Sequence, residues 1–178
     1  MRSEWIDQED LGHVLALLMP ANRLAMEIAI HTGLRIGDVL ALRSDTLAQR
    51  MTIHESKTGK SRRISLSRGL YARLKAISGQ IWVFEGAHDQ TKHRTRQAVW
   101  TDVKRAAKAL RLPHNVTPHS ARKVYAVEVY RRSGDLALAQ RLLNHESREV
   151  TMIYAMADHL AGGRREARSA PRAKDGGR

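Results

Sequence analysis

The stretch 20-PANRLAMEIAIHTGLRIGD-38 contains a complete helix signal, a stop and the beginning of a second helix. Pro20 suits the first turn of a helix, because a backbone N–H at that position would have no partner within the helix. Leu24 and Ile28 recur at helical spacing, and Gly33 is a typical residue for ending a helix. The stretch therefore predicts a helix from Pro20 to about Gly33, followed directly by a short second helix.

Most of the remaining chain shows the same helical periodicity, with one exception. The stretch 51-MTIHESKTGKSRRISLS-67 alternates apolar and polar residues on two arms, with Thr58 and Gly59 between them, which is the pattern of a β-hairpin. Asp7 is placed to cap the first helix. A brief extended piece is expected over 80–86, and the other helices over 8–18, 36–42, 68–77, 97–110, 119–132, 135–144 and 148–156. The predicted fold class is mainly α with a small antiparallel β-sheet (α+β).

The length and composition favour one globular domain with a short appendage. Of the 178 residues, 42% are hydrophobic, which suffices for a sizeable core, and residues 1–161 are expected to form that domain. Residues 162–178 are rich in Gly, Pro, Arg and Ser and are expected to form a basic, disordered tail. The chain has no cysteine, no apolar run long enough to cross a bilayer and no signal region at its start, so a cytoplasmic location is expected.

The charge balance indicates a polyanionic partner. There are 31 Lys and Arg residues against 18 Asp and Glu residues, a formal net charge of +13. Basic side chains that neutralise phosphates release condensed counterions, which favours binding to nucleic acid. Nucleic acid is therefore the leading partner class, and an anionic membrane surface is a distant second.

Several catalytic classes lack support in the sequence. There is no cysteine, no H-E-x-x-H, no close histidine pair on a helix and no acidic cluster suited to magnesium. The serine hydrolase motif G-x-S-x-G and the phosphate-binding motif G-x-x-x-x-G-K-[ST] are also missing. We therefore expect neither a metal nor a cofactor, and basic residues in the polar breaks of the fold remain as candidates.

Two of these basic residues are ambiguous when taken alone. Arg35 lies between two predicted helices, where its planar guanidinium would suit two phosphate oxygens. A helix-capping arginine paired with Asp38 explains the same position, and locally that interpretation is favoured. Lys57 lies near the tip of the hairpin, where it is either a solvated charge or a group that reaches DNA.

The pattern H-x-x-R occurs three times, so by itself it is weak, and the surroundings separate the pairs His93/Arg96, His119/Arg122 and His145/Arg148. The first lies in a polar loop. The second begins a helix after Thr117 and Pro118, which places both of its side chains on one face near the positive end. The third lies at a helix break, with Tyr154 on the next helix, where a tyrosine considered alone would be a packing residue.

Taken in order, the motifs 32-TGLRIGD-38, 56-SKTGK-60, 117-TPHSARK-123 and 142-LLNHESREVTMIY-154 resemble the catalytic domain of tyrosine recombinases, the family of phage integrases, chromosome-dimer resolvases and fimbrial invertases. The resemblance covers about residues 7–158. It implies six catalytic residues: Arg35, Lys57, His119, Arg122, His145 and Tyr154.

The chain departs from the family pattern in three ways. Asn144 replaces the glycine of L-G-H, and asparagine is the non-glycine residue that best tolerates the same left-handed backbone. Ala121 replaces the leucine of H-x-L-R. The chain also begins at the first helix of the catalytic domain, so we expect either a single-domain member or a fragment without the N-terminal DNA-clamping domain of most relatives.

The resemblance implies a metal-independent site-specific DNA recombinase. Tyr154 would attack a phosphodiester to form a 3′-phosphotyrosine, Arg35 and Arg122 would clamp the phosphate, and Lys57 would protonate the leaving oxygen. The implied partners are double-stranded DNA at a specific site, further copies of the chain in a tetramer, and accessory DNA-bending or directionality proteins; the implied location is the cytoplasm, with the nucleoid. Further phosphate contacts are expected from Lys60, Arg62, Arg63, Lys92, His93 and Arg94.

Three other functions remain open. A type IB topoisomerase uses a similar set of residues but relaxes one duplex as a monomer. A DNA-binding regulator could descend from an integrase without catalysis, although such a protein would have little reason to keep both Lys57 and Tyr154. A basic coating protein is disfavoured because only eight aromatic residues are available for base stacking.

Overall fold

The computed structural model describes residues 6–143, and these residues form a mostly helical fold with one small sheet. In chain order the elements are α1 (Gln8–Ala16), α2 (Pro20–Thr32), α3 (Ile36–Leu40), β1 (Arg50–His54), β2 (Ser61–Ser65), α4 (Arg68–Ile77), α5 (Arg96–Ala109), α6 (Pro118–Ser133) and α7 (Leu136–Leu143). The predicted fold class, mainly α with a small antiparallel sheet, is confirmed.

Short polar side chains cap the beginnings of five of the described helices, including α7, where the backbone N–H of Leu138 donates to Asp135 Oδ1 at 3.0 Å. The side chain of Asp7 accepts from the backbone N–H of Asp10 at 2.8 Å, as the sequence predicts, and Ser67, Thr95 and Thr117 act in the same way at α4, α5 and α6. Each cap satisfies a backbone N–H that has no partner within its helix. These boundaries are therefore set by residues that lie next to each other in the chain.

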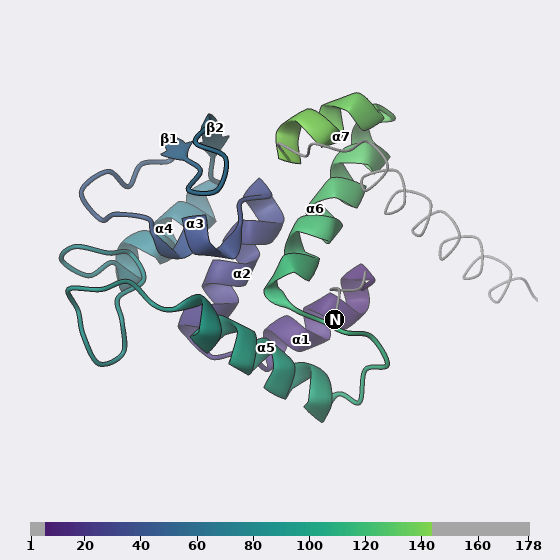
Figure 1. The fold of residues 1–178 in the computed structure, drawn as a ribbon, viewed down its shortest axis with the longest axis horizontal. Coiled ribbons are helices and arrows are strands. Elements are labelled where there is room, and N and C mark those ends of the chain that lie inside the picture. Colours follow the sequence, from purple (N-terminus) through teal and green to yellow (C-terminus); the bar gives the residue numbers. More distant parts are fainter. Residues whose placement is uncertain (1–5, 144–178) are drawn as a thin grey trace, which may run out of the picture.

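Helices α2 and α6 pack against each other and form the centre of the fold. Figure 1 shows α6 near the middle, with α5 and α1 towards one of its ends, α7 at the other, and the hairpin and α4 to the left in this view. The apolar faces of these elements share one core, which includes Leu24 and Ile28 of α2, Val99 of α5 and Val124 of α6.

The predicted hairpin is present, with β1 and β2 antiparallel in the register that pairs Met51 with Ile64. Side chains alternate between an exposed and an inward-facing side along both strands. Gly59 lies in the connecting turn with φ of 66°, a left-handed backbone that glycine adopts without strain. Ile64 and Leu66 on the second arm are buried and attach the hairpin to the core.

The structure differs from the predicted elements in a few places. The extended piece expected over 80–86 forms no strand; it makes only isolated bridges, Arg43 with Trp82 and Glu85 with His93. The reason is that it changes neighbour along its length: residues 81–83 bond to segment 42–44 and residues 84–86 to segment 92–94, each through only two backbone hydrogen bonds. Helices α1 and α3 end two residues earlier than predicted, at Ala16 and Leu40.

Two predicted segments, the helix over 148–156 and the tail over 162–178, lie outside the described residues. Within residues 6–143, no helix combines the length and the apolar character needed to span a membrane.

Candidate active site

The junction between α2 and α3 is built by four consecutive residues with different tasks. Thr32 donates its hydroxyl to the carbonyl of Ile28 and so completes the last turn of α2. Gly33 is the C-cap, with φ of 68° in the left-handed region. Leu34 is fully buried and fixes the turn in the core. Arg35 follows as the N-cap residue of α3, which confirms its predicted place at the beginning of a helix.

The partner of Arg35 is Glu55 and not Asp38. Arg35 Nη1 donates to Glu55 Oε2 at 2.6 Å, and the Glu55 side chain is completely buried. Asp38 instead accepts from both the backbone N–H and the hydroxyl of Ser56, at 3.0 and 2.7 Å. The local interpretation of Arg35 as a partner of Asp38 is therefore wrong, because the hairpin brings a buried carboxylate to the arginine.

Sequence reasoning missed Glu55, although one signal was present. Met51 and Ile53 are inward-facing residues of β1, and Glu55 continues the same alternation two residues later. A carboxylate on the inward side of a strand has to be paired there, because a buried charge without partners is strongly disfavoured.

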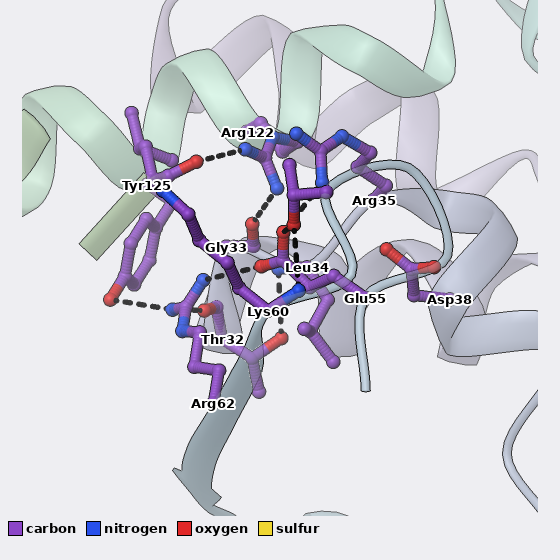
Figure 2. Close-up of polar contacts among 12 residues, drawn as sticks. Thr32, Gly33, Leu34, Arg35, Asp38, Glu55, Lys60, Arg62, Arg122 and Tyr125 are labelled. Atoms are coloured by element: carbon purple, nitrogen blue, oxygen red, sulfur yellow. Dashed lines mark hydrogen bonds and ion pairs between the residues drawn. The ribbon is translucent and has the colours of Figure 1, made fainter. Parts of the chain in front are cut away.

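Arg122 connects three helices. It lies in the second turn of α6, and its side chain is only 3% exposed. Its Nη1 donates to the carbonyl of Gly33 at 2.5 Å and its Nη2 to the carbonyl of Leu143 at 2.6 Å. One guanidinium thus joins the end of α2, the beginning of α6 and the end of α7 (Figure 2).

The electrostatic environment of Arg122 is unusual for an arginine. Burial and the positive charges of Arg35 and Arg62 lower the pKa of Arg122, the charges of Glu55 and Asp38 raise it, and the net result is a pKa of about 10. Arg122 therefore stays protonated at neutral pH. Four neighbouring charged groups thus act on the protonation of Arg122.

Arg62 is the third guanidinium of this cluster, and it points inward from β2. Its side chain is 11% exposed, and Nη1 lies 3.8 Å from Glu55 Oε1. Its Nη2 donates to the carbonyl of Thr32 and, at 3.3 Å, to the hydroxyl of Tyr125. The guanidinium also lies over the Tyr125 ring, 5.7 Å from its centroid. We call Arg35, Arg62, Arg122, Glu55 and Asp38 the arginine cluster (Figure 2).

The structure explains why a glycine precedes Leu34 and Arg35. A Cβ built on Gly33 would come within 2.5 Å of Tyr125 Cε1, in addition to the strain of its left-handed backbone. The close approach of α2 to Tyr125 on α6 brings the Gly33 carbonyl to Arg122. Gly33 therefore determines how near the two arginines of the sequence motifs can lie.

The loop that carries Lys57 is anchored at its beginning, while Lys57 itself is exposed. Ser56 is bound by Asp38, and the hydroxyl of Thr58 donates to Glu55 Oε2 at 3.1 Å. The neighbours of Lys57 on both sides are thus bound to the arginine cluster. His119 lies in the first turn of α6 with an exposed side chain, and its backbone N–H donates to the Thr117 hydroxyl at 3.2 Å.

The residues expected to contact phosphates occupy two kinds of position. Lys60, Arg63 and Lys92 are exposed, and Lys92 is paired with Asp89 at 3.0 Å. Arg62, His93 and Arg94 are half-buried and make internal contacts. Arg94 donates to the amide oxygen of Asn22 at 2.5 Å, and His93 Nδ1 lies 2.8 Å from the Arg94 carbonyl.

Three residues of the sequence motifs, Asn144, His145 and Tyr154, lie outside the described residues. Leu143, the last described residue, is held by Arg122, so the chain enters the LNH motif directly beside the arginine cluster. Among residues 6–143, no group of three or more His, Asp or Glu side chains is arranged to hold a metal ion.

Comparisons with known proteins agree with this architecture. A sequence model described as the phage integrase family matches residues 4–160. The catalytic domain of bacteriophage HP1 integrase is 21% identical, with a TM-score of 0.64, and the match covers 99% of this chain and 100% of that one. No curated protein sequence matches the chain.

Two larger recombinases share the fold. A lambda integrase dimer bound to a COC′ core site has a TM-score of 0.70 at 24% identity, over 86% of this chain and 48% of the other. XerH site-specific recombinase, in a pre-cleavage complex with its difH substrate, has a TM-score of 0.66 at 22% identity, over 84% of this chain and 50% of the other. The chain therefore spans about half the length of these two relatives.

Proposed function

Because this chain belongs to the phage integrase family, we propose that it cleaves and rejoins double-stranded DNA as a site-specific recombinase. One observation carries the proposal: Arg122 donates to the carbonyl of Gly33, two residues before Arg35. Two guanidiniums from distant parts of the chain therefore meet at one place. Such a pair suits a phosphodiester, whose non-bridging oxygens gain negative charge in the transition state.

The proposed reaction proceeds in two transesterifications. The Tyr154 oxygen attacks the phosphorus, the bond to the 5′-oxygen breaks, and a 3′-phosphotyrosine remains. His119 accepts the tyrosine proton, and Lys57 donates a proton to the leaving 5′-oxygen. The 5′-hydroxyl of a second strand then attacks the phosphotyrosine and releases Tyr154. The number of phosphoester bonds is conserved, so no nucleotide cofactor is needed.

In this proposal Arg35 and Arg122 bind the non-bridging oxygens, and His145 adds a hydrogen bond. The positive charge of the two guanidiniums takes the part that a metal ion plays in other phosphoryl transfers. The exposed cations Lys60, Arg63 and Lys92 would contact phosphates farther along the duplex. Such contacts fix the register of the protein on the DNA and add affinity. Because this added affinity is electrostatic, DNA binding should weaken as the salt concentration rises.

The finer proposals concern organisation and partners. Residues 1–161 would form the catalytic domain and 162–178 a basic tail that adds affinity for DNA. Copies of the chain would assemble on DNA as a tetramer, an idea that the similarity to a lambda integrase tetramer bound to a Holliday junction supports. Accessory DNA-bending or directionality proteins and a nucleoid location belong to the same proposal.

The experiment that tests the function does not require a known target site. The protein is incubated with a pool of duplexes that carry a randomised segment and a nick. After cleavage, the short strand between the cleaved bond and the nick dissociates. Its 5′-hydroxyl can then no longer attack the phosphotyrosine, so the covalent intermediate accumulates. Adducts that resist denaturation are isolated and their DNA is sequenced. We expect the wild type to enrich a defined sequence and Tyr154→Phe to give no adduct.

Tyr130→Phe serves as the matched control, since it removes a half-buried tyrosine hydroxyl from α6, outside the arginine cluster. It should form the adduct as the wild type does. An adduct that persists in Tyr154→Phe would refute the proposed nucleophile. Two copies of the enriched site on one plasmid then separate the functions: a recombinase exchanges the sites, a topoisomerase only relaxes supercoils, and a regulator binds without forming an adduct.

A further inference from the structure

Glu55 occupies an unusual position for a carboxylate. Its side chain is completely buried, and Oε2 accepts from Arg35 Nη1 at 2.6 Å and from the Thr58 hydroxyl at 3.1 Å. Its backbone is equally constrained: the N–H donates to the carbonyl of Lys60, and the carbonyl accepts from the N–H of Gly59, both at 2.9 Å. The carboxylate is thus held rigidly by the hairpin, on the inward side of the loop that presents Lys57.

The charge balance of the arginine cluster depends on this carboxylate. Three guanidiniums face two carboxylates, so the cluster carries an excess of one positive charge. Without Glu55, Asp38 would be the one carboxylate of the arginine cluster left to oppose the mutual repulsion of its three guanidiniums. Buried charges of like sign are strongly disfavoured unless they are paired. Glu55 therefore allows the arginines to gather while leaving the cluster cationic.

The contacts of Arg35 show how its guanidinium is held in place. Glu55 engages Nη1, while the Arg35 side chain remains 24% exposed. A guanidinium has five N–H donors in a planar fork, so fixing one nitrogen fixes the direction of the others. Arg122 and Arg62 are held by main-chain carbonyls, whereas the hydrogen bond of the Arg35 side chain goes to Glu55. Within residues 6–143, the position of the Arg35 guanidinium consequently depends on one side chain.

We propose that Glu55 is a positioning residue of the DNA-cleaving site, which holds the Arg35 guanidinium ready for the scissile phosphate while no DNA is bound. This inference rests on the proposed recombinase function. Glu55 touches neither the phosphate nor the nucleophile; it acts through Arg35. The same carboxylate accepts from Thr58, so it also links the position of Arg35 to the loop of Lys57.

The test compares two changes of Glu55 with one control. Glu55→Gln keeps the shape and removes the charge. Glu55→Asp keeps the negative charge, so it is the variant expected to fold best. Because its side chain is shorter, the carboxylate no longer reaches Arg35. Asp102→Asn is the matched control, because Asp102 is also a buried carboxylate bound to an arginine, on α5 and outside the arginine cluster. All variants are compared at a temperature at which circular dichroism shows each to be folded.

The first readout is the rate of adduct formation on the enriched DNA at saturating protein. We expect both Glu55 variants to form the adduct about 10–100 times more slowly than the wild type, since small misplacements of a positioning group cost rates of this order. DNA affinity should be retained, and Asp102→Asn should react at the wild-type rate. A wild-type rate in both folded Glu55 variants would overturn the proposal.

The second readout separates positioning from a merely structural role. A methylphosphonate at the scissile position lacks one negative oxygen, so its cleavage depends less on an oriented guanidinium. The rate ratio of wild type to Glu55→Gln should therefore shrink on this substrate. An equal ratio on phosphate and methylphosphonate DNA would show that Glu55 supports the fold alone, and would count against the inference.

The third readout is independent of DNA cleavage. The Nε–H resonance of Arg35, assigned with Arg35→Lys, is followed by nuclear magnetic resonance while inorganic phosphate is added. In the wild type, the chemical shift of this resonance should differ from that of a free arginine and should change when phosphate is added. In Glu55→Gln, the chemical shift should be that of a free arginine. If no DNA forms an adduct, the recombinase proposal fails, and an unchanged Arg35 resonance in Glu55→Gln overturns the Glu55 proposal separately.

Discussion

The fold contains two buried acid–base networks, and they differ in what they leave unsatisfied. Asp102 on α5 accepts from the Met19 N–H and the Asn22 amide through Oδ2, at 2.8 and 2.7 Å, and from Arg105 through Oδ1, at 2.6 Å. Both carboxylate oxygens have hydrogen bonds, and the charge of Asp102 is paired with that of Arg105. This network fastens the α1–α2 connection to α5.

The arginine cluster has the opposite character. It carries an excess positive charge, and it includes buried atoms without a hydrogen-bond partner among the described residues: Asp38 Oδ2, Arg62 Nη1 and Arg122 Nε. Leaving buried polar atoms unsatisfied destabilises a fold, so such groups require an explanation. A network whose buried carboxylate has both oxygens hydrogen-bonded indicates a structural role, whereas a cationic cluster with unsatisfied buried atoms indicates a site prepared for an anion.

The largest expected difference between the two networks concerns their arginines. Arg122→Ala should slow adduct formation by about 10²–10³-fold, the usual effect of removing one charge-stabilising donor from a catalytic site. Arg105→Ala, which removes the partner of Asp102, should leave the rate of the folded protein unchanged. Single-turnover assays at saturating protein measure both rates.

Arg122 also holds Gly33 and Leu143, so loss of folding has to be separated from loss of chemistry. Arg122→Lys retains a cation that fills much of the same space, and it should fold while still reacting slowly, because a lysine lacks the planar fork. A folded Arg122→Lys or Arg122→Ala variant with the wild-type rate would abolish the distinction between the two networks.

Gly33 offers a second, smaller contrast, with Gly134 as its control. Both are left-handed helix C-caps, with φ of 68° and 64°, but a Cβ would meet Tyr125 only at Gly33. Gly134→Ala should cost about 1–2 kcal/mol of unfolding free energy, the usual strain of a left-handed alanine. Gly33→Ala should cost about 2–5 kcal/mol, because overpacking adds to that strain.

Urea denaturation measures both changes. Since the Gly33 carbonyl accepts from Arg122, Gly33→Ala should also slow adduct formation, whereas Gly134→Ala should not. Equal destabilisation by the two substitutions would mean that α2 and α6 separate readily, and that Gly33 does not control the approach of the two arginines.

The smallest expected effect is the pH dependence of the Asp102 network. Burial opposes ionisation, but hydrogen bonds from Asn22 and Arg105 outweigh it and lower the pKa of Asp102. A carboxylate with a lowered folded pKa stabilises the fold above its unfolded pKa of about 3.9, and this contribution is lost as the pH falls through the folded value. Asp102→Asn should therefore cost about 1–3 kcal/mol at neutral pH.

The cost of Asp102→Asn should diminish as the pH falls below about 4, where Asp102 of the unfolded chain becomes protonated, and should reach its minimum below the lowered pKa of folded Asp102. Urea denaturation of both proteins between neutral and acidic pH measures this convergence. If Asp102→Asn lowers the unfolding free energy equally at neutral and acidic pH, Asp102 stabilises the fold through its shape and not through its charge. The Asp102 network would then differ from the arginine cluster in packing alone.

Much of the fold could be predicted from the sequence because its signals are local. Asp7 caps α1 through a bond to a residue three positions away, and α4 was predicted with its observed bounds, Arg68–Ile77. Alternation of apolar residues predicted the hairpin, and its turn lies at Thr58 and Gly59. The motifs likewise identified Arg35 and Arg122 as candidates, although the roles of the six motif residues remain predictions.

Only the tertiary structure decided how these candidates are held. Arg35 pairs with a residue 20 positions away and not with Asp38 three positions away, and Arg122 bonds to Gly33 across 89 positions. Arg62, predicted as a phosphate contact, turns inward to Thr32 and Tyr125. The sequence by itself determined the helices, the turn and the basic character, because caps, periodicity and charge depend on near neighbours. The arginine cluster depends on which buried charges meet when α2, α6 and the hairpin pack together, and that pairing is set by packing across the whole fold.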